Sequence, residues 1–105
     1  MLTSPSLVKK FLVENDPSVN DSWSLRYACT HGQIDVVRLL LQDGRADPST
    51  LNNFCLVWTS ERGMTEIVRL LLDDGRVDLS VDDNRPIRGA RKNEHTEIVE
   101  LLVED

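Results

Sequence analysis

The chain repeats itself with a period of 31 residues, and this feature constrains its fold more than any other. Residues 32–49 read GQIDVVRLLLQDGRADPS and residues 63–80 read GMTEIVRLLLDDGRVDLS, with 11 identical positions. A period of about 20 to 50 residues is typical of solenoids, in which each unit buries its apolar side against its neighbours. We therefore divide the chain into an N-terminal half-repeat that forms a capping helix and three repeats, the last of them C-terminally truncated: residues 1–15, 16–46, 47–77 and 78–105.

A polar turn and a first helix open each repeat. The turn contains Asp-x-Ser followed by Asp, Asn or Ser residues, which favour turns because their side chains hydrogen-bond nearby backbone. The first helices are predicted at residues 22–31, 53–62 and 84–93. Residues that commonly cap helices stand at their starts, namely Ser22, Asn53 and Asn84. One apolar-face position is always small, and we expect neighbouring helices to touch there: Ala28, Thr59 and Ala90.

A glycine and a second helix complete the repeat. Gly32 and Gly63 are predicted to end the first helix because glycine adopts positive φ readily, whereas the third repeat has Glu94 at this position. The second helices are predicted at residues 34–43, 65–74 and 96–105, and they end at Gly44 and Gly75 in the first two repeats. They are apolar nearly all round, so we expect them to be buried on several sides.

The second half of each repeat resembles the ankyrin repeat. The likeness rests on the glycine between the helices, on the run V-V-R-L-L-L or I-V-R-L-L-L, and on the glycine and aspartate that follow: Gly32, 36–41, Gly44 and Asp47, then Gly63, 67–72, Gly75 and Asp78. The family's T-P-L-H tetrad survives only as Pro86-Ile87, and the period of 31 is shorter than the family's usual length of about 33. The resemblance implies an all-α solenoid of stacked antiparallel helix pairs, with short turns in place of full β-hairpin fingers. It also implies protein–protein interaction without catalysis.

The resemblance places the partner-binding surface on the concave side, formed by the first helices and turns. In the repeat alignment, four of the five aromatic residues fall in two columns of the first two repeats, and the third repeat is basic instead. Aromatic residues and arginine dominate binding hot spots. We predict a groove suited to an acidic protein segment with an apolar anchor, lined by Trp23, Arg26, Tyr27, His31, Phe54, Trp58, Arg62, Arg85, Arg88 and Lys92. Alternatively, Tyr27 and Trp58 pack between repeats, and the arginines form a solvated face that pairs with Asp82 and Asp83.

Charge and composition argue against several other functions. The chain has 12 Lys and Arg against 18 Asp and Glu, and the net charge of −6 disfavours nucleic acid. No apolar run is long enough to span a membrane and no signal peptide is evident, so we expect an intracellular location, in cytoplasm or nucleus. Cys29 and Cys55 are predicted to be reduced and buried, and His31 and His95 have no acidic partner at catalytic spacing. We expect no catalytic residue, cofactor or metal site.

Two alternatives to a protein-binding module stay open at this point. One is a structural fragment or spacer of a longer array whose binding repeats lie elsewhere, and the other is an enzyme, which no residue pattern supports. The last helix repeats the apolar pattern of the internal helices, with only Glu100, Glu104 and Asp105 polar around it. Because solenoids need end repeats with a polar outer face, we expect this end to fray or to bring two copies together.

Overall fold

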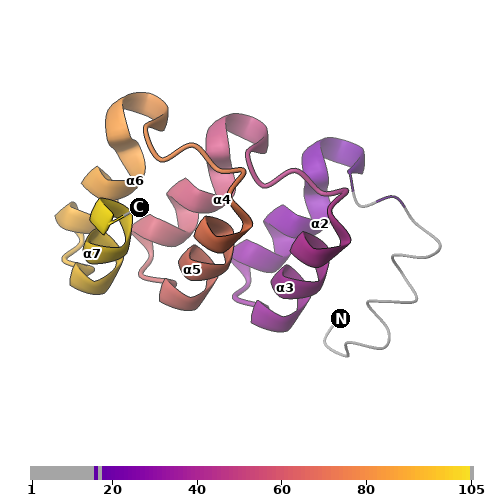
Figure 1. Ribbon diagram of the computed structural model, residues 1–105, viewed down its shortest axis with the longest axis horizontal. Helices are drawn as coiled ribbons and strands as arrows, with labels where there is room; N and C mark the ends of the chain where they lie inside the picture. Colours follow the sequence, from indigo (N-terminus) through magenta and orange to yellow (C-terminus); the bar gives the residue numbers. More distant parts are fainter. Residues whose placement is uncertain (1–15, 17, 105) are drawn as a thin grey trace.

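Three antiparallel helix pairs stand side by side along the long axis of the molecule (Figure 1). The computed structural model describes residues 16 and 18–104, and the predicted half-repeat at 1–15 lies outside them. The pairs are α2 (Val19–Thr30) with α3 (Ile34–Asp43), α4 (Thr50–Glu61) with α5 (Thr65–Asp74), and α6 (Val81–Lys92) with α7 (Thr96–Glu104). No strand occurs among the described residues, which confirms the prediction of an all-helical solenoid with short turns in place of hairpins. Each predicted repeat holds one pair, while the repeat boundaries stay a prediction.

The core lies between a layer of first helices and a layer of second helices. Helix α4 packs between α2 and α6, and α5 packs between α3 and α7. The predicted small-residue contacts are confirmed, since Ala28 is 1% exposed and Thr59 and Ala90 are fully buried. Other fully buried side chains come from both layers: Leu25, Leu56, Ile67, Leu71 and Ile98. In α7, Val103 is 63% exposed, and self-association there stays a prediction.

Each first helix opens with a left-handed turn. With this turn included, the helices begin earlier than predicted, at Val19, Thr50 and Val81. Asn20, Asp21 and Ser22 have φ of 52°, 54° and 57°, and the corresponding residues of the other two repeats have the same conformation. The right-handed helix follows at once, close to its predicted start. A left-handed conformation costs about 1–2 kcal/mol for each residue with a side chain. Other contacts must therefore hold these turns in place.

The Asp-x-Ser sequence braces the chain before each turn. Asp47 Oδ1 accepts hydrogen bonds from the Ser49 hydroxyl (2.6 Å) and from the Ser49 backbone N–H (2.8 Å), and Asp16 and Asp78 bind Ser18 and Ser80 in the same way. These hydrogen bonds lower the pKa of all three aspartates, because they stabilise the charged carboxylate. The brace is thus complete only when the aspartate is ionised.

Two of the three residues predicted to cap the first helices, Ser22 and Asn53, bind the next repeat instead. The Ser22 hydroxyl oxygen accepts a hydrogen bond from the Asp47 backbone N–H (2.7 Å), and Asn53 Oδ1 accepts one from the Asp78 N–H (2.8 Å). The N-cap residues of these helices are Ser18, Ser49 and Ser80, without a side-chain cap bond, so the capping prediction was wrong for Ser22 and Asn53. The left-handed backbone at Ser22 and Asn53 has turned these side chains from their own helices toward the following repeat.

The predicted glycine turns are confirmed, and contacts from later repeats cover them. Gly32 and Gly63 have φ of +67° and +76°, and Glu94 takes the same conformation with φ of +60°. The His95 ring lies over Gly63, and its Nε2 donates to Glu61 O (3.1 Å). These contacts set α6 and α7 against α4, and thereby fix the surface that the first helices share.

Candidate functional site

Three aromatic rings form a column on the outside of α2. Trp23, Tyr27 and His31 are spaced four residues apart, so they lie on one face of the helix. The ring centroids of Trp23 and Tyr27 are 5.2 Å apart, and the Tyr27 and His31 rings stack at 3.9 Å. Trp23 is 51% exposed and Tyr27 is 38% exposed. The exposure of Tyr27 argues against the alternative that it packs between repeats, whereas Trp58, which the same alternative named, is half-buried.

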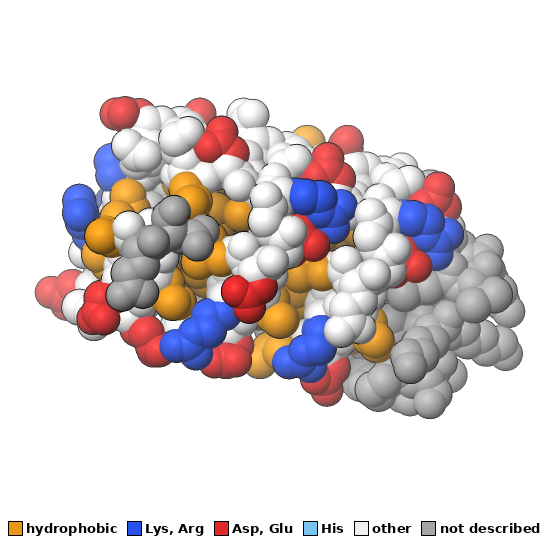
Figure 2. All heavy atoms as spheres, in the orientation of Figure 1, with side chains coloured by type: hydrophobic (Ala, Val, Ile, Leu, Met, Phe, Trp, Pro, Cys, Tyr) orange, Lys and Arg blue, Asp and Glu red, His pale blue; other side chains and the backbone are white. Residues whose placement is uncertain are grey.

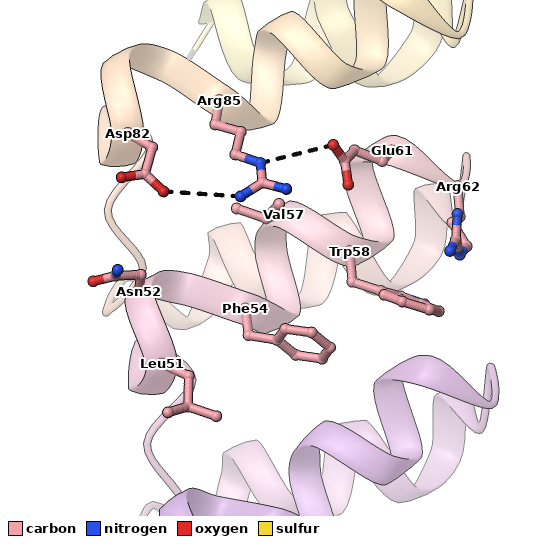
Figure 3. A pocket seen from close by; sticks show the side chains of 9 residues that line it. All are labelled: Leu51, Asn52, Phe54, Val57, Trp58, Glu61, Arg62, Asp82 and Arg85. Carbon is pink, nitrogen blue, oxygen red and sulfur yellow. Dashed lines mark ion pairs between the residues drawn. The ribbon is translucent and has the colours of Figure 1, made fainter.

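Helix α4 carries a second column with the same spacing. The centroids of Phe54 and Trp58 are 5.7 Å apart, and the Arg62 guanidinium carbon lies 3.8 Å from the Trp58 ring centroid, a cation–π arrangement. Both rings are half-buried and point from α4 toward α2 (Figure 3). We call the residues Trp23, Tyr27, His31, Phe54, Trp58 and Arg62 the aromatic columns.

The third repeat has no such column, because Arg85 and Gly89 stand at the positions of the two aromatic rings. A side chain on Gly89 would collide with Glu61, since a Cβ there would stand 2.5 Å from Glu61 Cγ. The Glu61 side chain therefore lies against α6 at Gly89, with its carboxylate directed toward Arg85 (Figure 3). The Arg85 guanidinium lies 3.8 Å from Glu61 and 3.9 Å from Asp82 (Figure 3). Both distances are longer than a hydrogen bond, so these two carboxylates hold Arg85 loosely.

Two of the predicted binding arginines hold the left-handed turns of their own repeats. Arg26 donates from Nε to Asp21 O and from Nη2 to Asn20 O, both at 3.0 Å. Arg88 donates in the same way to Asp83 O and Asp82 O, both at 2.7 Å. The sequence carried a signal for this role, because Arg26 and Arg88 occupy the same repeat position. Arg88 binds the backbone of Asp82 and Asp83, whereas the alternative interpretation had assigned it their carboxylates.

A pocket of about 380 Å³ opens between the turn of the second repeat and α6 (Figure 3). It brings together four of the predicted residues: Phe54, Trp58, Arg62 and Arg85. Sequence reasoning missed the other lining residues, Leu51, Asn52, Val57, Glu61 and Asp82. They belong to two repeats and come together only when α4 and α6 are side by side. The predicted residue Lys92 lies outside this lining, exposed at the end of α6.

The second helices present a different surface. Arg38 pairs with Asp35 at 2.9 Å, and Arg69 pairs with Glu66 at 2.8 Å and with Glu97 at 2.6 Å. Acidic and basic side chains lie next to one another across the face shown in Figure 2. Such exposed pairs contribute about 0–1 kcal/mol each and neutralise one another locally. The aromatic columns therefore distinguish the first-helix side.

The described residues contain no group of three or more His, Cys, Asp or Glu side chains that could hold a metal ion. Cys29 and Cys55 are free and buried, as predicted. The neighbouring Cys55 thiol and burial raise the pKa of Cys29, which disfavours the reactive thiolate. No helix within residues 18–104 is long and apolar enough to cross a membrane.

The stacked pairs and their shared surface define a helical-repeat solenoid. The family model of the ankyrin repeat matches residues 24–54, a stretch of one full period from α2 into α4. Residues 24–54 thus form an ankyrin repeat, and the all-helical stack fits an ankyrin-repeat solenoid, as the sequence predicted. No curated protein matches it. Ankyrin repeats generally mediate protein–protein interaction and are typically non-catalytic.

Proposed function

We propose that this protein is a non-catalytic module that binds a protein partner across its first helices and turns. The observation that carries the proposal is the exposure of Trp23 and Tyr27 beside the half-buried rings of Phe54 and Trp58. Large aromatic side chains on a surface cost little conformational entropy to immobilise and supply much of the energy in protein interfaces. Their rings extend over two adjacent repeats, so one partner segment can contact both columns.

The partner segment also carries an acidic residue in this proposal. Arg85 and Lys92 lie on the first helix of the third repeat, spaced seven residues apart and therefore on the same face. Both are exposed, and the Arg85 guanidinium forms no hydrogen bond within the described residues. A carboxylate beside the apolar anchor of the partner would pair with these cations. Opposite charges of this kind also speed association at low salt.

Selection from a random-peptide display library, with the intact chain as bait, tests the proposal. Selected peptides should lose about tenfold or more in affinity against Trp23→Ala and against Phe54→Ala, since truncating a hot spot costs about 2 kcal/mol or more. Arg38→Ala and Arg69→Ala, on the second helices, serve as matched surface controls and should leave binding unchanged. Circular dichroism melts confirm that each variant is folded. Peptides whose binding depends on Arg38 or Arg69 and not on the aromatic columns would contradict the proposal.

The acidic preference has its own test. Arg85→Glu should weaken acidic selected peptides at low salt, whereas Arg91→Glu, an equal charge change on the same helix, should have a smaller effect. Arg88 is unsuitable for this purpose because it holds the turn of its own repeat. Failure to select any peptide that depends on the first-helix side would favour the alternative that these repeats act as a spacer.

A further inference from the structure

One repeat position alternates between arginine and valine. Residues 26, 57 and 88 are Arg, Val and Arg, each the fourth residue of the right-handed part of its first helix. In the first and third repeats, the guanidinium reaches back over the left-handed turn and donates to two successive backbone carbonyls. The same protein therefore shows twice how its turn binds a guanidinium group.

The second repeat keeps the turn but lacks the arginine. Leu51, Asn52 and Asn53 have φ of 53°, 55° and 59°, so their backbone repeats the conformation that Arg26 and Arg88 bind elsewhere. Within the part of the chain that the structure describes, no side chain donates a hydrogen bond to Leu51 O or Asn52 O. Val57 is too short to reach them.

Val57 stands in place of the arginine, lines the pocket between α4 and α6, and is 7% exposed. We call the region lined by Leu51, Asn52, Val57, Glu61 and Asp82 the Val57 notch. Its two carboxylates face Arg85 at 3.8 and 3.9 Å without hydrogen bonds, so both retain acceptor capacity. The notch thus adds two carboxylates to the two carbonyl oxygens of the turn, and the Arg85 guanidinium lies between the carboxylates (Figure 3).

We propose that the Val57 notch binds an arginine side chain of the partner, in the manner of Arg26 and Arg88. A guanidinium group is planar and carries five N–H donors in a fixed fork, which suits two adjacent carbonyls. A lysine ammonium is a point charge that cannot reproduce this paired geometry. This inference rests on the proposed function, and it identifies one residue of the partner segment.

Small blocked amino acids test the notch without any partner protein. Nα-acetyl-arginine methylamide is titrated into the ¹⁵N-labelled full chain, with the citrulline and lysine analogues as matched probes. We expect shifts of the amide signals at residues 51–57 and 82–85, with a Kd on the order of 1–10 mM for a single side chain. Citrulline has nearly the same shape without the charge and should bind about tenfold more weakly or not at all. Equal shifts with citrulline or lysine would overturn the proposal, as would shifts produced only by the glutamate analogue.

Substitution of Val57 supplies a second, independent measurement. Val57→Arg should fill the notch from within the chain, abolish the response to the arginine probe, and melt about 4 °C or more above Val57→Met. Val57→Met has a side chain of similar reach without the guanidinium. A Val57→Arg variant that is less stable than Val57→Met, or that still responds to the probe, would overturn the proposal. Because the probes are single residues, a negative result here leaves the peptide-selection test of the proposed function intact.

Discussion

Glu94→Gly should stabilise the protein, because Glu94 holds a backbone conformation that the other repeats assign to glycine. Its φ is +60°, against +67° at Gly32 and +76° at Gly63. A residue with a side chain loses about 1–2 kcal/mol in this conformation, whereas glycine adopts it freely. Glycine also has more conformational freedom in the unfolded chain, which offsets about 0.5–1 kcal/mol of the gain. We therefore expect a net stabilisation of about 0.5–1 kcal/mol, or about 2–8 °C in melting temperature for a domain of this size.

Thermal and urea unfolding of three variants separates this cause from others. Glu94→Ala removes the same charge but keeps Cβ, so it should change stability little. Gly63→Ala should destabilise by more than the strain alone, because its Cβ would lie 2.7 Å from Cε1 of His95. If Glu94→Ala stabilises as much as Glu94→Gly, charge and not backbone strain is the cause. If Gly63→Ala is neutral, the close packing of His95 on this turn has been misjudged.

Three further predictions concern packing, the turns and pH. Ala28→Leu should destabilise by about 1–3 kcal/mol in urea unfolding, since an overpacked helix contact must shift, and an unchanged midpoint would contradict the close contact there. Arg88→Met should cost about 1–2 kcal/mol through the loss of two turn hydrogen bonds, whereas Arg38→Met, which loses one exposed ion pair, should cost at most about 0.5 kcal/mol. Folding lowers the pKa of Asp47 below 3.8, so its contribution is complete above the unfolded pKa and is lost as pH falls through the folded value. Unfolding at pH 5, 4 and 3 should accordingly show a smaller loss of stability for Asp47→Asn than for the wild type, and parallel curves would refute the role of the Ser49 hydrogen bonds.

Much of the fold could be predicted because its signals are local. Glycines at fixed spacing mark the turns, and the apolar run of the second helices predicts burial on several sides. The left-handed turns could not be predicted, because Asn20, Asp21 and Ser22 are equally compatible with ordinary turns and helix caps. The partner of the Ser22 side chain is the N–H of Asp47, which lies 25 positions along the chain. A contact of that kind exists only after the repeats have stacked.

The candidate site could also be predicted only in part. Repeat alignment found the aromatic columns, because residues at one repeat position share a face of the solenoid. It did not show that Arg26 and Arg88, which were predicted to bind a partner, also hold backbone carbonyls of their own turns. It also gave no weight to Val57, because a valine on a helix indicates burial. The meaning of Val57 depends on the arginines at its two equivalents, and becomes apparent only once their hydrogen bonds are known.

The hydrogen bonds between neighbouring repeats recur with the repeat period, and they bear on how such a protein can lengthen. Residues 47–77 supply a donor to the preceding repeat through the Asp47 N–H, and an acceptor to the following one through Asn53. Arg76 adds donation to Gly44 O and Ala46 O of the unit before it. The repeat at residues 47–77 thus contains both a donor and an acceptor for the hydrogen bonds that join neighbouring repeats. A tandem duplication of these 31 residues would bring this set of hydrogen bonds with it. The second copy would also place Trp58 where Gly89 now leaves room for Glu61, so lengthening by this unit requires a small residue at that position as well.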